Sequence, residues 1–288
     1  MEPALEIRGL SKDYGDFRLE DVTFTVPRGS VCGLIGPNGA GKTTIIKLIL
    51  NLARRRAGEI RVFGLDNIRD EVAVKSRIGF VHETPLFYEH MSLRRIRDTV
   101  APFYPKWDDG LFDRLLREFD LPPGKRFVRL SRGMKMKFAL ALALSHDADL
   151  LVLDEPTSGL DPVFRRRLLE RLREFIQDED KSILFSTHIT ADLERIADHI
   201  AFILDGAIVF CSPLDEVLER WGVVKGGPEL DGPGTEDLFL GIRRGEFGVQ
   251  ALTDDVPEAR RRLGRDAVVE RASLEDIMFY LTKENRRA

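Results

Sequence analysis

The arrangement of hydrophobic residues changes along the chain. Near the N-terminus, F-R-L-E-D-V-T-F-T-V (17–26) has apolar residues at every second position from Val22 onward, which is typical of a half-buried strand. Later segments are almost continuously apolar: S-V-C-G-L-I (30–35), D-L-L-V-L-D-E (149–155) and S-I-L-F-S-T (182–187). Such runs predict strands that are buried on both faces of a parallel sheet.

A helical pattern separates the first two of these buried runs. It extends from about residue 92 to residue 146, with Pro and Gly interruptions near 102–105 and 122–124. Because this block stands between two strands of the predicted sheet, we expect an inserted helical subdomain at about 84–147. Strands and helices alternate elsewhere up to residue 222. This order predicts one α/β domain over 1–222, with its active site at the carboxyl ends of the parallel strands.

The last part of the chain has a different composition. The segment G-G-P-E-L-D-G-P-G-T (226–235) predicts a linker, which we place at 223–236. Residues 237–288 are expected to form a small α/β accessory domain. Its final helix is predicted to begin at Ser273, with Asp276 three residues later completing a capping box.

The composition limits the compartment and the partners. With 44 basic and 48 acidic residues among 288, the formal net charge is −4, which argues against nucleic acid as the main partner. The basic clusters Arg54–Arg56 and Arg165–Arg167 could suggest a nucleic-acid site, but the second lies on an amphipathic helix with Leu168, Leu169 and Leu172 and is interpreted as a solvated helix face. Only two cysteines, Cys32 and Cys211, are present, which favours a reducing, cytosolic compartment. No apolar run approaches the roughly 20 residues of a membrane span, so action at a membrane would require another chain.

The most specific chemical signal is G-P-N-G-A-G-K-T at 36–43. It matches the pattern G-x-x-x-x-G-K-[ST], a loop between a strand and a helix whose backbone N–H groups converge on phosphate oxygens. Lys42 supplies a positive charge for the β- and γ-phosphates, and the Thr43 hydroxyl is placed to ligate Mg²⁺. The chain is therefore expected to bind ATP or another nucleoside triphosphate with Mg²⁺. The predicted nucleotide-binding residues of this segment are Gly36, Pro37, Asn38, Gly39, Ala40, Gly41, Lys42, Thr43 and Thr44.

Two carboxylates end the apolar run at 149–155. Asp154 stands where a strand end would hold Mg²⁺, and Glu155 beside it is a candidate general base for hydrolysis. An ordinary strand terminus can also end in two acidic residues. The position of this pair about 110 residues after the phosphate loop favours the hydrolytic interpretation.

Three further segments follow in a characteristic order: L-S-R-G-M-K (130–135), S-G-L-D (158–161) and F-S-T-H (185–188). With the phosphate loop and L-V-L-D-E, they resemble the ATPase subunit of an ABC transporter over roughly residues 4–220. The resemblance implies a P-loop NTPase fold with an N-terminal antiparallel β subdomain and an inserted helical subdomain. In that family two subunits enclose the nucleotides between them.

The resemblance assigns roles to residues outside the phosphate loop. Ser131 and Gly133 would close over the γ-phosphate bound by the partner subunit, and Asp161 would face the partner's phosphate loop. His188 matches the histidine that senses the γ-phosphate, and we treat it as catalytic with Glu155. Tyr14 in K-D-Y-G matches the aromatic residue that stacks on adenine.

The chain departs from the family pattern at two places. Arg132 and Met134 occupy positions at which the L-S-G-G-Q loop has glycine and glutamine. Glu83, after the strand-like R-I-G-F-V-H-E (77–83), replaces the glutamine that reaches Mg²⁺ and the attacking water. A carboxylate also ligates Mg²⁺, so Glu83 is predicted to be both a metal ligand and a catalytic residue. The departures concern the rate of hydrolysis and its coupling across the dimer.

The resemblance implies a transporter ATPase at the cytoplasmic face of the membrane. It would act as a peripheral subunit through integral-membrane permease subunits on a separate chain, and with a second ATPase subunit, either a copy or a related chain. The finer similarity is to bacterial exporter-type systems, carried by I-G-F-V-H-E-T-P-L-F-Y-E-H-M-S and S-L-E-D-I-M-F-Y-L-T-K-E. The alternative is a soluble ABC-type ATPase that acts on nucleic acid or ribosomes. A P-loop kinase would not need the segments at 130–135, 158–161 and 185–188.

Overall fold

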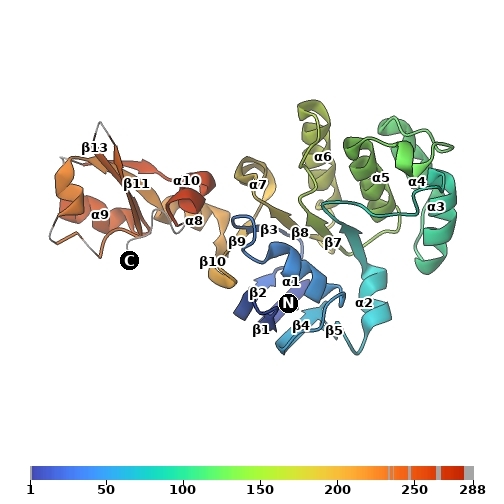
Figure 1. Ribbon diagram of the computed structural model, residues 1–288, viewed down its shortest axis with the longest axis horizontal. Helices are drawn as coiled ribbons and strands as arrows, with labels where there is room; N and C mark the ends of the chain where they lie inside the picture. Colours follow the sequence, from blue (N-terminus) through green and yellow to red (C-terminus); the bar gives the residue numbers. More distant parts are fainter. Residues whose placement is uncertain (1, 233, 236, 246–247, 264–266, 282–288) are drawn as a thin grey trace.

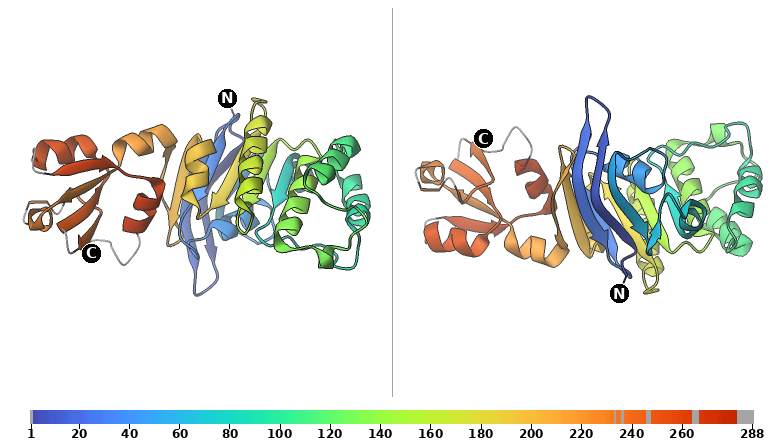
Figure 2. Two further views of the ribbon diagram at one scale, coloured as in Figure 1. Left: turned by 90° about the horizontal axis from the view of Figure 1, so that it is seen from above. Right: turned by 90° about the horizontal axis from the view of Figure 1, so that it is seen from below.

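Three sheets with surrounding helices make up the computed structural model, which describes residues 2–232, 234–235, 237–245, 248–263 and 267–281. A central six-stranded sheet lies between an N-terminal sheet and a group of helices, and a third sheet forms a separate block at the C-terminal end (Figure 1). In both views of Figure 2, the C-terminal block lies at one end of the long axis and the helices of residues 93–144 at the other, with the N-terminal and central sheets between them.

The central sheet has the order β10-β9-β3-β8-β7-β6. All neighbouring strands are parallel except β9 and β10, which are antiparallel. The strands are β3 (Val31–Ile35), β6 (Ile78–Val81), β7 (Leu150–Asp154), β8 (Ser182–Thr187), β9 (His199–Leu204) and β10 (Ala207–Pro213). Every residue of β3, β7 and β8 is buried, as the apolar runs predict.

The N-terminal sheet is antiparallel and has the order β2-β1-β4-β5. Its strands are β1 (Leu5–Asp13), β2 (Arg18–Val26), β4 (Ala57–Val62) and β5 (Leu65–Asp66). Helix α1 (Lys42–Ile49) contributes to the same hydrophobic core, and α2 (Glu71–Arg77) leads into β6. The alternation predicted from Val22 onward is present, since Val22, Phe24 and Val26 are buried and the residues between them are exposed.

The helical subdomain lies on the β6 side of the central sheet (Figure 1). It contains α3 (Leu93–Val100), α4 (Asp109–Glu118), α5 (Arg132–Leu144) and the 3₁₀ turns η1 (Ala101–Phe103) and η2 (Phe127–Arg129). Polar side chains cap each α-helix: Ser92, Asp108 and Ser131 accept a hydrogen bond from a backbone N–H of the first turn. The α5 residues from Phe138 to Leu144 are all buried, which joins this subdomain to the core of the central sheet.

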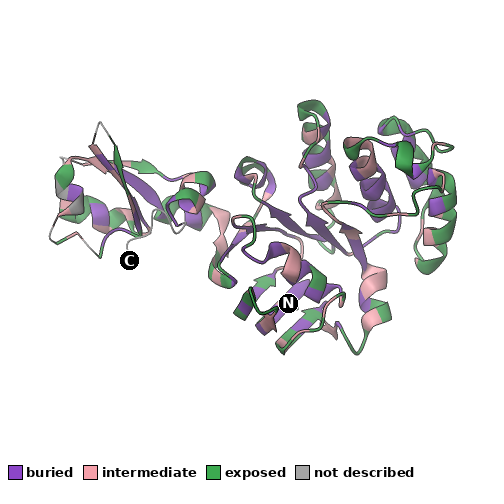
Figure 3. Cartoon of the chain, in the orientation of Figure 1, coloured by how far each residue is buried: buried purple, intermediate pink, exposed green. Residues whose placement is uncertain are grey.

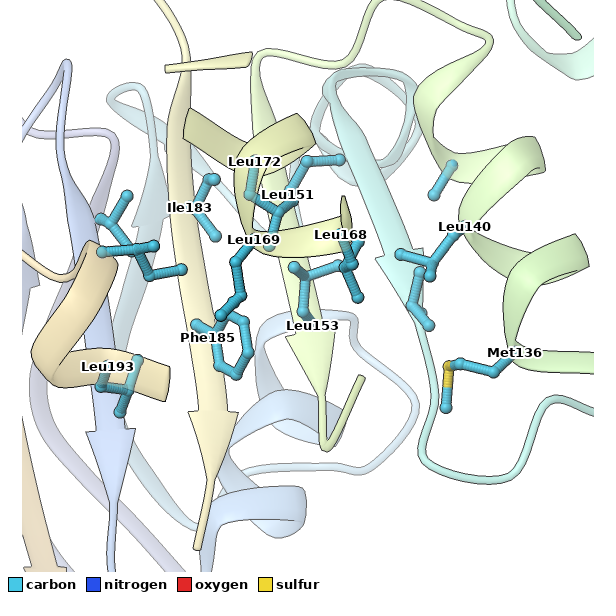
Figure 4. Packing of buried hydrophobic residues seen from close by; sticks show 14 of the residues in the cluster. Met136, Leu140, Leu151, Leu153, Leu168, Leu169, Leu172, Ile183, Phe185 and Leu193 are labelled. Atoms are coloured by element: carbon cyan, nitrogen blue, oxygen red, sulfur yellow. The ribbon is translucent and has the colours of Figure 1, made fainter. Parts of the chain in front are cut away.

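Two helices cover the face of the central sheet that is opposite the N-terminal sheet. They are α6 (Pro162–Phe175) and α7 (Thr190–Ile196). In Figure 4, Leu168, Leu169 and Leu172 of α6 pack on β7 and β8, with Met136 and Leu140 of α5 on one side and Leu193 on the other. Alternate residues of β7 therefore serve two cores: Leu151 and Leu153 this one, Leu150 and Val152 the N-terminal one.

The C-terminal block has an antiparallel sheet of order β12-β13-β11-β14. Helix α8 (Leu214–Arg220) leads into this block. The block consists of β11 (Gly222–Gly226), η3 (Pro228–Asp231), β12 (Gly241–Gly245), β13 (Gly248–Thr253), α9 (Val256–Leu263), β14 (Val268–Arg271) and α10 (Leu274–Tyr280). The capping box of Ser273 and Asp276 at the start of α10 is present.

The predicted linker at 223–236 differs from the structure. Strand β11 pairs with both β13 and β14, so it is an inner strand of the C-terminal sheet. Val224 and Leu230 are buried in the core of that block. The Gly- and Pro-rich composition marks a strand followed by a tight turn, and the block begins near residue 222. In Figure 3, buried residues lie along the inner strands of this block, and exposed residues lie on its outside.

The C-terminal block is attached to the rest of the protein by side-chain packing as well as by the covalent chain. Leu274 and Ile277 of α10 belong to the same hydrophobic cluster as Leu193 of α7. The backbone N–H of Leu274 also donates to the carboxylate of Glu194, at 2.8 Å. Within the described residues, no helix has the length and apolar character needed to cross a membrane.

Candidate nucleotide-binding site

The phosphate loop joins β3 to α1, and two of its glycines have backbone conformations that L side chains rarely adopt. Gly39 has φ +82° and Gly41 has φ +116°. Gly36 has no room for a side chain, because an added Cβ would lie 2.2 Å from the carbonyl oxygen of Ile203. The loop therefore depends on glycine at these positions, as a loop that presents its backbone N–H groups to an anion requires.

Lys42 is buried inside this loop. Its ammonium donates to the carbonyl oxygens of Gly36 at 2.7 Å and Pro37 at 3.2 Å, and it lies 3.9 Å from Oε1 of Glu155. Burial lowers the pKa of Lys42, while the carboxylates of Glu155, Asp154 and Glu83 act in the opposite direction. A positive charge is thus held at the centre of the loop, where its carbonyl partners can be exchanged for phosphate oxygens.

Thr43 and Asp154 bring together the oxygens of a magnesium site. The Thr43 hydroxyl donates to Oδ2 of Asp154 at 3.0 Å, and the Ser186 hydroxyl donates to Oδ1 at 3.1 Å. Burial raises the pKa of Asp154, and these two hydrogen bonds lower it in part. A hydroxyl and a carboxylate side by side are hard oxygen donors, so the residues present fit Mg²⁺ bound together with phosphates.

Glu155 is held in a strained conformation at the end of β7. Its φ of +48° lies in the left-handed region, which costs a residue with a side chain about 1–3 kcal/mol. The Thr187 hydroxyl donates to its Oε2 at 3.0 Å, and the backbone N–H of His188 donates to its Oε1 at 3.0 Å. Nδ1 of His188 lies 2.9 Å from Oε2. The end of β8 therefore fixes the position of the Glu155 carboxylate.

A cavity of about 540 Å³ lies over these groups. It contains nine residues predicted from the sequence: Asn38, Gly39, Gly41, Lys42, Thr43, Thr44, Glu83, Glu155 and His188. Gly36 and Pro37 contact the site through their carbonyl oxygens, which accept hydrogen bonds from the Lys42 ammonium. Asp154 contacts it through its carboxylate, which accepts a hydrogen bond from the Thr43 hydroxyl. Ala40 closes the loop, since its N–H donates to the carbonyl of Pro37 at 3.2 Å.

Besides Gly36, Pro37, Ala40 and Asp154, four predicted residues lie outside the lining of this cavity. Ser131 caps α5, accepting from the N–H of Met134 at 3.2 Å, and Asp161 caps α6, accepting from the N–H of Phe164 at 2.9 Å. Gly133 lies beside the loop that carries Asp161: an added Cβ would be 3.8 Å from the carbonyl of Gly159. One chain thus contains two separate groups of predicted nucleotide-binding residues.

Tyr14 is the fourth predicted residue outside the cavity lining, and Phe17 lines the cavity instead. Tyr14 is 51% exposed, and the ammonium of Lys12 lies 4.7 Å from the centre of its ring. Phe17 lines the cavity beside Gly41, where an added Cβ would approach its ring to 2.9 Å. None of the sequence motifs identifies Phe17. An aromatic residue three positions after Tyr14 on the same turn is the signal that could have pointed to it.

The fold and this cavity define a nucleotide-binding ATPase domain, and comparison with known proteins gives its family. The family model described as ABC transporter matches residues 19–158. The chain is 33% identical over 218 residues to the ABC transporter ATP-binding protein YtrB of Bacillus subtilis, covering 75% of this chain and 74% of YtrB. It is 31% identical over 223 residues to the bacitracin transport ATP-binding protein BcrA of Bacillus licheniformis, covering 76% and 73%.

Solved structures agree. One ATP-binding subunit of an ABC transporter is 35% identical, with a TM-score of 0.69, and the match covers 75% of this chain and 92% of that one. A dimeric ATP-binding cassette bound to ADP and phosphate has the same fold, with a TM-score of 0.64 at 19% identity over 73% of this chain and 98% of that one. The chain belongs to the ABC transporter family as an ATP-binding subunit. It binds and hydrolyses ATP to drive transport.

Proposed function

We propose that this subunit binds ATP with Mg²⁺ in the cavity over the phosphate loop and closes face to face with a second ATPase subunit. The observation that carries the proposal is the separation of the two groups of predicted residues within one chain. The phosphate loop lines the cavity, and Ser131 and Gly133 lie outside it. Two half-sites on one chain suit a two-fold symmetric pair, in which each subunit completes the other's site.

Within the site, the residues have distinct roles. Lys42 binds the β- and γ-phosphates, and Thr43 and Asp154 hold Mg²⁺, which when bound neutralises phosphate charge. Glu155 accepts a proton from the attacking water, and its two oxygens are already oriented by Thr187 and His188. His188 lies at the cavity wall and contacts Glu155, so it is in position to respond to the γ-phosphate.

A permease would dock on the apolar surface that follows Glu83. Two cavities of about 290 and 440 Å³ share Leu86, Phe87 and Val100 between residues 85–88 and the helical subdomain. Leu86 is 83% exposed and Tyr88 is 70% exposed. The occupant that we propose is an apolar cytoplasmic segment of the permease. Residues 83–88 connect this surface to the nucleotide cavity, so one short segment contacts both sites.

The basic clusters do not favour a nucleic-acid partner, because several of their arginines have acidic neighbours. Arg56 lies 3.6 Å from Asp13. Arg165 pairs with Asp192 at 2.7 Å, and Arg166 pairs with Glu170 at 3.1 Å. These pairs count against the alternative of an ATPase that acts on nucleic acid. The role that we propose is therefore a peripheral subunit at the cytoplasmic face of the membrane, working through a permease of the exporter type.

The docking proposal is tested by co-purification. The chain is co-expressed with candidate permeases, and complexes are purified from detergent-solubilised membranes. We expect Leu86→Asp to release the subunit from the permease while its ATP affinity stays within about two-fold, because the substitution lies outside the nucleotide cavity. Val72→Asp, at an 84% exposed position on α2, is the matched control and should stay bound. Retention of Leu86→Asp in the complex would contradict docking at this surface.

A further inference from the structure

The two departures from the family pattern meet in space. Nη2 of Arg132, the first residue of α5, lies 3.7 Å from Oε1 of Glu83, which follows β6. The same nitrogen donates to the hydroxyl of Ser158 at 3.3 Å. One side chain therefore connects the start of α5, the residue after β6 and the loop that leads to Asp161.

The stem of Arg132 is also placed by packing. An added Cβ at Gly159 would lie 3.4 Å from Nε and 3.5 Å from Cδ of Arg132, so the arginine lies along the face of a residue that has no side chain. Gly159 itself has φ +73°, a conformation that favours glycine. The direction of Arg132 toward its own subunit thus rests on a packing contact as well as on two polar ones.

The charge of Glu83 explains why such a contact is needed. Glu83 lines the nucleotide cavity with Glu155, and Asp154 lies beneath Thr43. A triphosphate brought into a cavity with these carboxylates is repelled by each of them, and the Lys42 ammonium at the cavity wall offsets part of that repulsion. Arg132 brings a further positive charge to the edge of the cavity through Glu83.

We infer that Arg132 is a positioning residue for ATP hydrolysis that acts within its own subunit: it balances the charge of Glu83 and holds the 158–161 loop through Ser158. Two effects follow, and they separate experimentally. The charge effect changes ATP affinity and exists only when Glu83 is present. The effect on the loop changes the rate constant kcat through Asp161 and does not depend on Glu83.

The test is a double-mutant cycle of Arg132→Ala and Glu83→Gln in the full chain. Mg²⁺-free ATP binding is measured by calorimetry, and kcat and KM are measured with Mg²⁺. We expect Arg132→Ala to weaken ATP binding about two- to five-fold in the chain that keeps Glu83, which is the range for a partly exposed ion pair. In the Glu83→Gln variant the same substitution should weaken ATP binding less than about two-fold. The kcat should fall in both backgrounds.

Two controls distinguish this role from a general structural one. Arg132→Lys keeps the charge and loses the guanidinium, so ATP affinity should be restored while kcat stays low. Arg129→Ala removes an exposed arginine on η2, three residues earlier, and should change neither quantity. An equal loss of ATP affinity with and without the Glu83→Gln substitution would mean that Arg132 acts on a nucleotide directly, and would overturn the inference.

The inference rests on the proposed nucleotide cavity, and Lys42→Ala run in parallel tells the two failures apart. If Lys42→Ala binds ATP like the wild type, the nucleotide does not occupy this cavity and the proposed function fails. If Lys42→Ala loses ATP binding while the Arg132 and Glu83 effects are additive, only the role of Arg132 fails.

Discussion

Nδ1 of His188 lies 2.9 Å from Oε2 of Glu155, and the backbone N–H of the same histidine donates to Oε1 at 3.0 Å. The end of β8 therefore contacts both oxygens of the carboxylate at the end of β7. Movement of His188 toward or away from a γ-phosphate would move the Glu155 carboxylate with it. The proposed general base and the proposed phosphate sensor are therefore in direct contact at the ends of two neighbouring strands.

This arrangement makes Glu155→Gln an informative variant. Glutamine keeps the shape and one acceptor oxygen but removes the base, so ATP hydrolysis should fall about 10²- to 10⁴-fold while ATP still binds. The variant should accumulate an ATP-bound dimer, which is measured by light scattering at saturating ATP with Mg²⁺. A variant that stays monomeric, with and without a permease or a partner ATPase, would contradict the symmetric closure proposed above.

Lys42→Ala should abolish tight ATP binding. The loop loses its fixed positive charge for the β- and γ-phosphates, and hydrogen bonds to charged groups contribute about 1.5–3 kcal/mol each. Calorimetry against ATP measures the loss directly. Lys47→Ala is the matched control, because Lys47 lies on the exposed side of the same helix α1 and should bind ATP normally. Unchanged ATP affinity in the Lys42 variant would contradict the assignment of this cavity as the ATP-binding site.

Thr43→Ala should separate metal binding from nucleotide binding. Its hydroxyl is the group beside Asp154 that is predicted to ligate Mg²⁺, at 3.0 Å from Oδ2. We expect Mg²⁺-dependent hydrolysis to fall by about ten-fold or more, and Mg²⁺-free ATP binding to change by less than about two-fold. Thr43→Ser keeps the hydroxyl and should retain most activity. Equal losses in the two measurements would show that Thr43 does not act through the metal.

The local parts of the site are predictable from the sequence because short segments specify them. The loop at 36–43 needs glycines at fixed positions, and Gly36, Gly39 and Gly41 all show crowding or a positive φ that disfavours a side chain. Asp154 is the last residue of a buried strand and Glu155 follows it, so their position at the sheet edge follows from the apolar run. The capping box at Ser273 depends on residues only three positions apart.

The remaining parts depend on contacts between distant segments. Phe17, rather than Tyr14, lines the cavity because the turn after β1 brings it over Gly41, and no sequence pattern fixes that direction. Glu83 and Arg132 are far apart in the chain, and their ion pair exists only in the folded subunit. The glycines of β11 resemble those of a turn and so predict a linker, whereas pairing with β13 and β14 makes this segment a strand.

His146 gives a prediction on stability and pH. It is buried against Tyr104, with the ring centres 3.9 Å apart, and its pKa is lowered to about 4, mainly by burial. Asp147 and Asp149 raise that pKa and Lys181 lowers it further. In the unfolded chain this histidine has a pKa near 6.5. The contribution of neutral His146 to the free energy of unfolding is therefore fully present above that pH and is lost as the pH falls toward 4.

The expected size of this effect is at most about 2 kcal/mol between pH 7 and pH 5, from the difference between the two pKa values. His146→Phe cannot take up a proton, so its thermal unfolding midpoint should fall less than that of the wild type over this range. His90→Phe removes an exposed histidine and should leave the wild-type dependence unchanged. Parallel curves for the wild type and His146→Phe would mean that this histidine is protonated in the folded protein.

The last prediction decides which aromatic residue contacts the adenine. Phe17 lines the cavity, whereas Tyr14 is half exposed beneath Lys12. Stacking of a base on an aromatic ring is worth about 1–3 kcal/mol on substitution by alanine. We expect Phe17→Ala to weaken ATP binding by about this amount, and Tyr14→Ala to do so only if the turn between them rearranges when the nucleotide binds.

Inorganic tripolyphosphate, which has the phosphates without the base, controls for damage to the loop. Because Phe17 also lies against Gly41, its removal could disturb the phosphate loop directly. A loss of stacking weakens ATP binding and leaves tripolyphosphate binding unchanged, whereas a disturbed loop weakens both. A loss for ATP alone in Tyr14→Ala and none in Phe17→Ala would assign the adenine to Tyr14, as the family resemblance implies. It would also show that the β1–β2 turn closes over the nucleotide.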